Sequence, residues 1–496
     1  MIAPRQWLHH IGSYDVKGPM PNLKINTIEI TVEPGTLLVD ACARAGFPIP
    51  QYCFHPALSP VATCRMCMVE IKGQPKLATS CTTPAMDGQE VFTQSPVVAD
   101  ARAGIMEFLL MNHPLDCPIC DQAGECRLQD YSYQYGSGDS RMVEPKRRYR
   151  YEDLGAKIVI DKNRCIHCTR CIRFTQEVSG TSELTVANRG AQLEVTTYAG
   201  RSMDDNPLAG NVVDLCPVGA LTSRDFRFNK RAWYLKPVAT ISRHSALASP
   251  IWADVDQNRV WRFRPRPQEG KTSSYFLFDH ERYQYHRYDL DPATRAVQPL
   301  LRGAAATGEQ VAGALESAGP VAVVLQGTFG CDTAQRFGEL AASPDLRFGS
   351  GECLYPIQFP ALQTSADGIF NRRGCSERGY RFGHLEELLE RVRSGEVGAV
   401  VILHDAAFTS VRESQQLKEI MAAARFSLVF EPIPGELSDL ATARLPVATY
   451  LEETDFVVNH EGELRCYKKA LDPPKGVKSA VEWAWELLKA HQASLV

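Results

Sequence analysis

The pattern of apolar and polar residues predicts a small β-rich domain at the start of the chain. Residues 23–32 (LKINTIEITV) alternate in the way typical of a half-buried strand. A Pro34-Gly35 turn follows, then a short apolar helix over residues 37–45. Gly46 stands where a helix C-cap is expected. The predicted order of elements is therefore strand, turn, helix and then a cysteine-containing loop.

The same reasoning predicts different elements further along. Residues 101–112 have apolar positions at helical spacing, and residues 157–161 read as a short strand. In the carboxyl-terminal half, buried strands are predicted at 321–325 and 397–403, and helices at 415–424 and 481–491, after a linker at 290–303. Strands that alternate with helices predict an α/β domain with a parallel sheet.

Composition narrows the possible classes of protein. A chain of 496 residues has room for several domains, and its formal net charge of −4 does not favour a nucleic-acid binder or a polybasic membrane anchor. The first residues show no apolar run of the signal-peptide type, and no apolar stretch is long enough to span a bilayer. We therefore expect any membrane association to be indirect, through partner subunits.

The cysteines carry the strongest chemical signal. Eleven of the sixteen lie between Cys53 and Cys216, in three blocks. Pairs separated by two residues are too close for ordinary structural disulfides, so these thiols favour metal binding in a reducing compartment. The remaining thiols show no ligand spacing and are expected to be buried: Cys42, Cys331, Cys353, Cys375 and Cys466.

The first block has ten, two and thirteen residues between successive cysteines. Four thiolates on one loop system match a [2Fe–2S] cluster, which needs two on each iron. A four-cysteine zinc site is the alternative, but zinc ribbons use two close pairs and only one occurs here. The predicted ligands are Cys53, Cys64, Cys67 and Cys81.

The second block combines a histidine with three cysteines: His113, Cys117, Cys120 and Cys126. Three cysteines and a histidine can complete a [4Fe–4S] cluster with one neutral ligand, which should raise its reduction potential. A zinc site with the same ligands remains open. A single histidine before a proline is more often a surface or capping residue, so spacing alone leaves His113 undecided.

The third block begins the bacterial ferredoxin run Cys-x2-Cys-x2-Cys-x3-Cys-Pro, in which the fourth cysteine of each run binds the other cluster. Here the positions that retain cysteine all belong to one cluster under that rule: Cys165, Cys168, Cys171 and Cys216. The positions that have lost it all belong to the other: Thr175, Asn206, Ala209 and Val212. The sequence predicts a two-cluster fold in which one [4Fe–4S] cluster is retained and the other is removed completely.

Three segments resemble one family in detail: PIPQYCFHPALSPVATCRMCMVE, HPLDCPICDQAGECRLQDYSYQYG and DLCPVGALTSRDFRF. The chain resembles the large iron–sulfur subunit of respiratory complex I (NADH-quinone oxidoreductase), the 75 kDa subunit family, continuously from about residue 20 to 235. The resemblance implies that His113 is a ligand. It implies electron transfer from a flavin-bearing, NADH-binding subunit toward quinone-proximal subunits, within a hetero-oligomer that is peripheral to the cytoplasmic side of the inner (plasma) membrane. It implies one [2Fe–2S] and two [4Fe–4S] clusters, and no catalytic residue or substrate site on this chain.

The expected fold class is α+β in the amino-terminal part, followed by a reduced α/β domain that resembles molybdopterin oxidoreductases. We predict a β-grasp [2Fe–2S] ferredoxin domain at 20–100, a helical His-ligated [4Fe–4S] segment at 101–150, and a single-cluster bacterial-ferredoxin-like domain at 151–229. The beginning of the molybdopterin-oxidoreductase-like region follows at 230–290, where residues 241–249 contain no cysteine for a further cluster. The shortened α/β domain at 291–496 is expected to hold no molybdenum cofactor.

Two other interpretations remain open. A NAD-dependent formate dehydrogenase or hydrogenase can use the same electron-transfer module, although hydrogenases commonly keep both ferredoxin clusters. A zinc-stapled interaction scaffold is the non-redox alternative.

Overall fold

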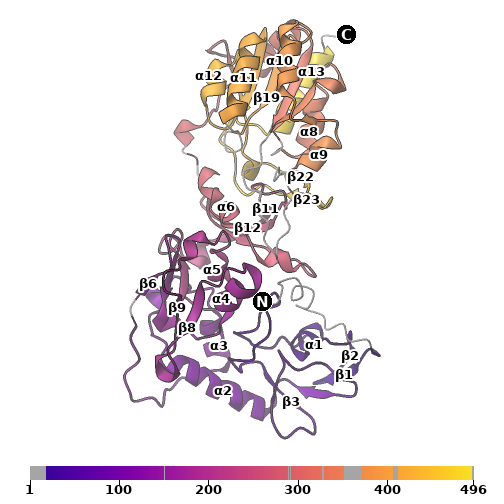
Figure 1. Ribbon diagram of the computed structural model, residues 1–496. Coiled ribbons are helices and arrows are strands. Elements are labelled where there is room, and N and C mark those ends of the chain that lie inside the picture. The colour runs from indigo at the N-terminus through magenta and orange to yellow at the C-terminus, as the bar shows by residue number, and fades with distance from the viewer. Residues whose placement is uncertain are drawn as a thin grey trace. The chain divides into compact units, whose positions relative to one another are not determined.

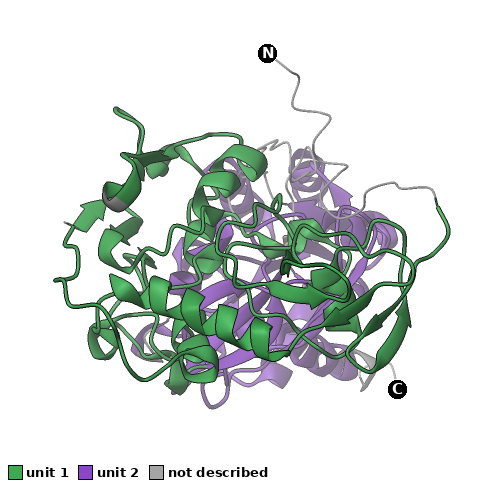
Figure 2. Cartoon of the chain, turned by 90° about the horizontal axis from the view of Figure 1, so that it is seen from below, with its two compact units in different colours: residues 1–235, 268–279, 359–362 green, residues 236–267, 280–358, 363–496 purple. Residues whose placement is uncertain are grey.

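The computed structural model describes residues 18–149, 151–288, 290, 292–326, 329–350, 371–405 and 411–493. The chain divides into two compact units (Figure 2). Unit 1 comprises residues 1–235, 268–279 and 359–362, and unit 2 comprises 236–267, 280–358 and 363–496. No helix in the described part of the chain is both long enough and apolar enough to cross a membrane.

Unit 1 begins with a five-stranded sheet of order β2-β1-β5-β3-β4, in which β1 and β5 are parallel. Helix α1 packs its apolar residues into the core of this sheet. The elements are β1 (Asn22–Ile25), β2 (Ile28–Thr31), α1 (Leu38–Arg44), β3 (Met68–Ile71), β4 (Ala78–Thr79) and β5 (Glu90–Phe92). The helix prediction for 37–45 is confirmed, and Gly46 has the positive φ of +87° expected after a helix end.

The single strand expected at 23–32 is instead an antiparallel hairpin of β1 and β2. The chain reverses at Asn26, which adopts a φ of +51°. Asparagine tolerates this left-handed conformation better than most residues, so a local turn interrupts an otherwise regular alternation. The prediction of one strand was wrong for this reason.

The rest of unit 1 consists of the 16-residue helix α2 and shorter elements (Figure 1). The helix expected at 101–112 is longer and begins at a proline, and the strand expected at 157–161 is present as β7. The elements are α2 (Pro96–Met111), α3 (Arg127–Tyr135), β6 (Tyr151–Asp153), β7 (Ile158–Asp161), α4 (Arg170–Arg173), β8 (Leu184–Ala187), β9 (Glu194–Thr197), α5 (Asn211–Leu215) and β10 (Leu221–Ser223). Strands β10, β7 and β6 form one sheet, and β8 and β9 a hairpin.

Unit 2 is dominated by an eight-stranded sheet of order β15-β14-β21-β20-β19-β16-β17-β18. Two separate hydrophobic cores line its faces, and helices cover both, as in α/β folds. The elements are β14 (Leu300–Leu301), β15 (Ala304–Ala305), α7 (Gly308–Ser317), β16 (Val321–Gln326), α8 (Cys331–Gly338), β17 (Arg347–Ser350), α9 (Arg372–Ser376), β18 (Arg381–Phe382), α10 (Leu385–Arg393), β19 (Ala399–Leu403), α11 (Val411–Ala423), β20 (Phe426–Glu431), α12 (Glu436–Leu440), β21 (Ala443–Pro446) and α13 (Ala480–Ala493).

The predicted parallel sheet is confirmed from β21 to β18, where all neighbours are parallel. The sheet as a whole is mixed, because β14 pairs antiparallel with both β15 and β21. Part of the expected linker at 290–303 is therefore an edge of the sheet. Smaller elements complete the chain: β11 (Lys236–Ile241), β12 (Pro250–Asp256), β13 (Arg259–Pro265), α6 (Asp279–Arg282), β22 (Asp455–Val458) and β23 (Leu464–Tyr467).

The thiols predicted to be structural behave differently from one another. Cys42, Cys331 and Cys375 are fully buried, as expected. Cys466 is exposed, which corrects the prediction: it lies on the short strand β23, where the adjacent Tyr467 takes the buried position. Cys353 lies outside the described residues.

Candidate metal centres

The first cysteine set comes together on the loops around β3 and β4. The backbone N–H of Cys53 donates to Sγ of Cys64 at 3.5 Å, and the sulfurs of Cys67 and Cys81 are 3.2 Å apart. Hydrogen bonds from the thiols of Cys64 and Cys81 lower the pKa of Cys53 and raise their own pKa values. Four thiols thus share one site. Cys42 is a core residue of α1, where burial raises its pKa to about 12.

The second set gathers its three cysteines between α2 and α3. Cys117 is exposed, whereas Cys120 and Cys126 are each 8% exposed. Burial raises the pKa of Cys120 and of Cys126, and charge interactions among the three thiols add to the rise. With raised pKa values, these thiols favour the protonated form. A bound metal cation would instead favour the thiolate form.

His113 lies two residues after the end of α2, and its buried Nδ1 atom has no hydrogen-bond partner among the described residues. Burial lowers its pKa to about 4, so the ring is in the neutral form that binds metals. The ring lines a cavity together with Cys165 and His167. The structure therefore places His113 beside the third set and not in hydrogen-bond contact with the second, and its role as a ligand stays a prediction.

The third set is complete in space. Its four cysteines line one small cavity together with apolar residues and Arg170: Cys165, Cys168, Cys171 and Cys216. Burial, followed by the neighbouring thiols, raises the pKa of Cys165 and of Cys216 to about 12. Throughout the described ranges, no three His, Cys, Asp or Glu side chains converge as on a single metal ion. These sulfurs instead surround a space, which is the arrangement that a multi-atom cluster requires.

The four positions that lost cysteine are all fully buried: Thr175, Asn206, Ala209 and Val212. Asn206 donates to the hydroxyls of Ser179 and Thr181 at 3.1 Å. The side chains at these four positions are part of the packed interior, and Asn206 is held by hydrogen bonds.

The second and third sets lie against each other. Sγ of Cys126 is 3.9 Å from the carbonyl oxygen of Pro217, directly after Cys216. A Cβ at Gly219 would lie 2.2 Å from Sγ of Cys120, so only glycine allows this loop to approach the sulfur. The CPVGA segment therefore contacts both sets: Cys216 belongs to the third set, and Gly219 lies against Cys120 of the second.

A buried aromatic residue lies near thiols of both the first and the second set. Tyr52 is fully buried, donates its hydroxyl to the sulfur of Met106 at 3.3 Å, and packs edge-on against Tyr131 at 5.3 Å between ring centroids. Burial raises its pKa, with further contributions from Tyr131, Cys126 and Cys64. The phenol therefore lies within range of thiols from both sets.

Three buried arginines accompany the thiols, each 4–5% exposed: Arg102, Arg170 and Arg173. Among the residues that the structure describes, none forms an ion pair with a carboxylate. Arg102 donates to the Met68 carbonyl at 3.1 Å and lies over the Tyr135 ring, within range of Cys67. Burial lowers the pKa of Arg170 to about 10. Burying a cation without an anion costs free energy. The cysteine thiols as ligands and the three buried arginines as cations therefore both fit an anionic iron–sulfur cluster.

Sequence reasoning missed these arginines and Tyr52. A signal was present, because Arg170 and Arg173 stand three residues apart within the third cysteine run, where a buried segment should be apolar.

Three family models match the chain. A 2Fe–2S iron–sulfur cluster binding domain matches residues 19–96, the NADH-ubiquinone oxidoreductase-G iron–sulfur binding region matches 102–141, and the ferredoxin-like domain of NADH-quinone oxidoreductase subunit 3 matches 155–222.

Several characterised proteins are similar to the chain over about half of its length. The chain is 42% identical over 266 residues to the NADH-ubiquinone oxidoreductase 75 kDa subunit of Reclinomonas americana, covering 54% of this chain and 38% of that protein. It is 43% identical over 275 residues to the NADH-quinone oxidoreductase G subunit of Rickettsia felis, covering 55% and 41%. It is 41% identical over 300 residues to the mitochondrial NADH dehydrogenase (ubiquinone) iron–sulfur protein 1 of Solanum tuberosum, covering 60% and 40%.

A solved structure of NAD+-reducing [NiFe]-hydrogenase in the H2-reduced state is also similar. It is 29% identical, covers 42% of this chain and 90% of that chain, and has a TM-score of 0.39.

The amino-terminal half of the chain is thus made of ferredoxin-like 2Fe–2S and 4Fe–4S binding domains. Over this half, the chain is similar to the complex I large iron–sulfur subunit, known as the G or 75 kDa subunit. It spans 38–41% of the length of these curated relatives.

Proposed function

We propose that this chain is an iron–sulfur electron-transfer subunit of a proton-translocating NADH:quinone oxidoreductase. Electrons would come from a flavin-bearing, NADH-oxidising subunit and leave toward quinone-proximal subunits of the same hetero-oligomer, peripheral to the cytoplasmic side of the membrane. The observation that carries this proposal is the gathering of eleven cysteines, far apart in sequence, at three neighbouring places in unit 1.

We assign the cysteine ligands as the spacing predicts, and His113 as the family resemblance implies. A [2Fe–2S] cluster would be held by Cys53, Cys64, Cys67 and Cys81; one [4Fe–4S] cluster by His113, Cys117, Cys120 and Cys126; and a second by Cys165, Cys168, Cys171 and Cys216. When bound, each cluster supplies one-electron redox chemistry. The corresponding domains are the β-grasp domain at 20–100, the His-ligated segment at 101–150 and the single-cluster domain at 151–229. A molybdopterin-oxidoreductase-like region without its cluster or cofactor would follow at 230–290 and 291–496.

The role of the chain's own residues would be to position the clusters, to neutralise their charge and to shield them from water. Backbone N–H groups donate to sulfurs, such as His167 to Cys165 at 3.4 Å and Cys53 to Cys64 at 3.5 Å. These donors favour thiolates and help to set reduction potentials. Apolar residues such as Ile160 and Leu221 line the third cavity and exclude water. No general acid, base or nucleophile is required.

The test is the metal content and spectrum of the chain purified without oxygen. Three clusters require about ten iron and ten acid-labile sulfide per chain. EPR of the reduced protein should show one [2Fe–2S] and two [4Fe–4S] signals, without molybdenum. A colourless, EPR-silent protein with stoichiometric zinc would refute the proposal, and molybdenum together with iron would favour a formate dehydrogenase.

A further inference from the structure

Two of the buried arginines connect the first and third cysteine sets. Both lie on α4, within the third set: Arg170 precedes Cys171, and Arg173 follows it by two residues. Their guanidinium groups extend to the loop of the first set, more than a hundred residues earlier in the chain. They are therefore placed between two candidate clusters.

Each guanidinium donates hydrogen bonds in two directions. Arg173 donates through Nη2 to the carbonyl of Cys53 at 2.5 Å and to that of Cys168 at 3.3 Å, and through Nη1 to that of Ser59. Two of these acceptors, Cys53 and Cys168, are predicted ligands of different clusters.

Arg170 repeats the arrangement a turn earlier. It donates through Nη1 to the carbonyl of Leu215 at 3.2 Å, directly before Cys216, and through Nη2 to that of Phe54, directly after Cys53. The two side chains thus tie the same pair of loops twice. Only the planar, many-donor guanidinium can do this, because the point charge of a lysine cannot span both loops in fixed geometry.

Within the described residues, the charges of the pair are not matched by a protein anion. The acceptors are neutral, namely backbone carbonyl oxygens and the Thr169 hydroxyl at 3.4 Å from Arg173 Nε, and no described carboxylate forms an ion pair with Arg170 or Arg173. Thiolate-ligated clusters are anions, and reduction adds one electron and one negative charge to a cluster without making or breaking a bond. A fixed cation nearby stabilises the reduced form more than the oxidised form.

We propose that Arg170 and Arg173 form a guanidinium bridge that sets the separation of the [2Fe–2S] cluster and the Cys165–Cys216 cluster and raises the reduction potentials of both. They act as positioning residues, since they contact backbone carbonyls and not the reacting atoms. This inference rests on the proposed function, because it requires the clusters to be present.

The test replaces Arg173 and measures potentials by EPR-monitored redox titration of the full chain with its clusters assembled. Arg173→Met should lower the midpoint potentials of the [2Fe–2S] cluster and of the Cys165–Cys216 cluster together, and leave that of the second set nearly unchanged. Arg173→Lys keeps the charge but not the bridge. It should restore both potentials toward wild type while the magnetic coupling between the two reduced clusters, read by pulsed EPR, stays weaker than in wild type.

Arg231 provides a matched control. Its guanidinium donates to the carbonyls of Cys120, at 2.7 Å, and of Pro118, both in the second set. Arg231→Met should shift the potential of the second set alone. A common shift of all three clusters in both Met variants would overturn the proposal, because it would reveal a general loss of packing.

Unchanged potentials in an Arg173→Met protein with a full set of EPR signals would overturn the bridge and leave the proposed function intact. Absence of iron from the wild-type chain would instead refute the proposed function itself. If Arg173→Met does not assemble clusters, Arg173→Gln, which is neutral but keeps a donor for one carbonyl, is titrated and judged by the same criterion.

Discussion

Several buried arginines of unit 2 have a carboxylate partner that three buried arginines of unit 1 lack. In unit 2, Arg295 makes two hydrogen bonds of 2.8 Å to Glu452, Asp254 accepts from two arginines of β13, and Arg243 pairs with Asp405. In unit 1, Arg102, Arg170 and Arg173 donate to backbone carbonyls without a carboxylate partner within the described residues.

The difference lies in whether a buried charge is compensated by the protein itself or requires a bound anion. A buried pair compensates its own charge, whereas a buried lone cation is stable only when an anion of another kind lies close by. The three lone cations occur beside the cysteine sets, where Arg164, which is 3% exposed, is the exception that pairs with Asp116 and Asp161. These three arginines of unit 1 therefore lack compensation by a described carboxylate, whereas the three examples from unit 2 have it.

The strongest test of this contrast removes a thiol from each unit. Cys216→Ala should eliminate one [4Fe–4S] signal, about four of ten irons, and leave the [2Fe–2S] signal intact, because the third set loses its only distant ligand. The matched variant Cys331→Ala, at a fully buried thiol of unit 2, should keep all the iron. Survival of both [4Fe–4S] signals in Cys216→Ala would show that the crossing assignment is wrong.

Breaking a pair in unit 2 should cost stability directly. Arg295→Leu leaves Glu452 buried and uncompensated, with side chains that are 3% and 5% exposed in the native pair. We expect a loss of about 3–5 kcal/mol in the free energy of unfolding, measured by denaturant titration. The double variant with Glu452→Leu should recover much of this loss. If the double variant is no more stable than the single one, charge compensation does not explain the effect.

The histidines of the two units differ in the same way as the arginines. His404 is paired with Glu431 in unit 2, whereas Nδ1 of His113 has no hydrogen-bond partner in the part of the chain that the structure describes. His113→Cys should lower the potential of the second set, since it adds a thiolate charge. The [2Fe–2S] potential in the same titration is the internal control. A potential that is unchanged or raised would argue against His113 as a ligand.

A buried acid of unit 2 predicts a pH dependence. Burial, and then the charge of Asp455, raises the pKa of Glu453 from its ordinary 4.5 to about 8. The folded state then binds more protons than the unfolded state between these values, so stability should fall as pH rises from about 4.5 to 8 and level off above that. The slope is at most about 1.4 kcal/mol per pH unit. Glu453→Gln should flatten it in denaturant titrations across this range, and an unaltered slope would assign the dependence to other groups.

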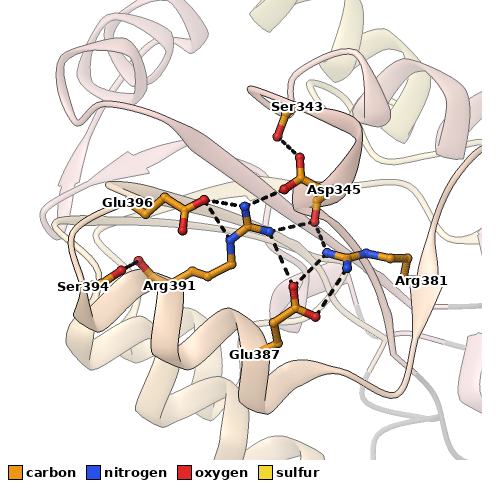
Figure 3. A network of polar contacts seen from close by, with 7 residues as sticks. All are labelled: Ser343, Asp345, Arg381, Glu387, Arg391, Ser394 and Glu396. Carbon is orange, nitrogen blue, oxygen red and sulfur yellow. Dashed lines mark hydrogen bonds and ion pairs between the residues drawn. The ribbon is translucent and has the colours of Figure 1, made fainter.

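The smallest effect is expected at the exposed network of Figure 3, where Arg391 and Arg381 face Asp345, Glu387 and Glu396. Hydrogen bonds from Ser343 and Arg391 lower the pKa of Asp345 from 3.8 to about 2. The contribution of the Asp345 carboxylate to the stability of the folded state should be present above its ordinary pKa. It should be lost as the pH falls toward its lowered pKa. Asp345→Asn should lower the melting temperature only slightly, and less at high salt, because solvent screens surface pairs. A loss comparable to that of Arg295→Leu would contradict this ranking.

Much of the secondary structure was predictable because it depends on local pattern. The helix at 37–45 and the strands at 321–325 and 397–403 were expected within a few residues of α1, β16 and β19. Predictions failed where one residue or a distant partner decided the outcome. Asn26 turned an expected strand into a hairpin, and β14 became a strand only because β21 lies beside it.

The sequence by itself determined which cysteines form sets, because ligand spacing is a local property of a short chain segment and the crossing rule extends it to Cys216. It could not determine which sets adjoin. Tertiary structure alone decides that Gly219 faces Cys120 and that Tyr52 lies near thiols of two sets. It also decides that Arg170 and Arg173 reach the loop of the first set. The reason is physical: burial and charge compensation depend on what surrounds a side chain, and its surroundings come mostly from residues far away in sequence.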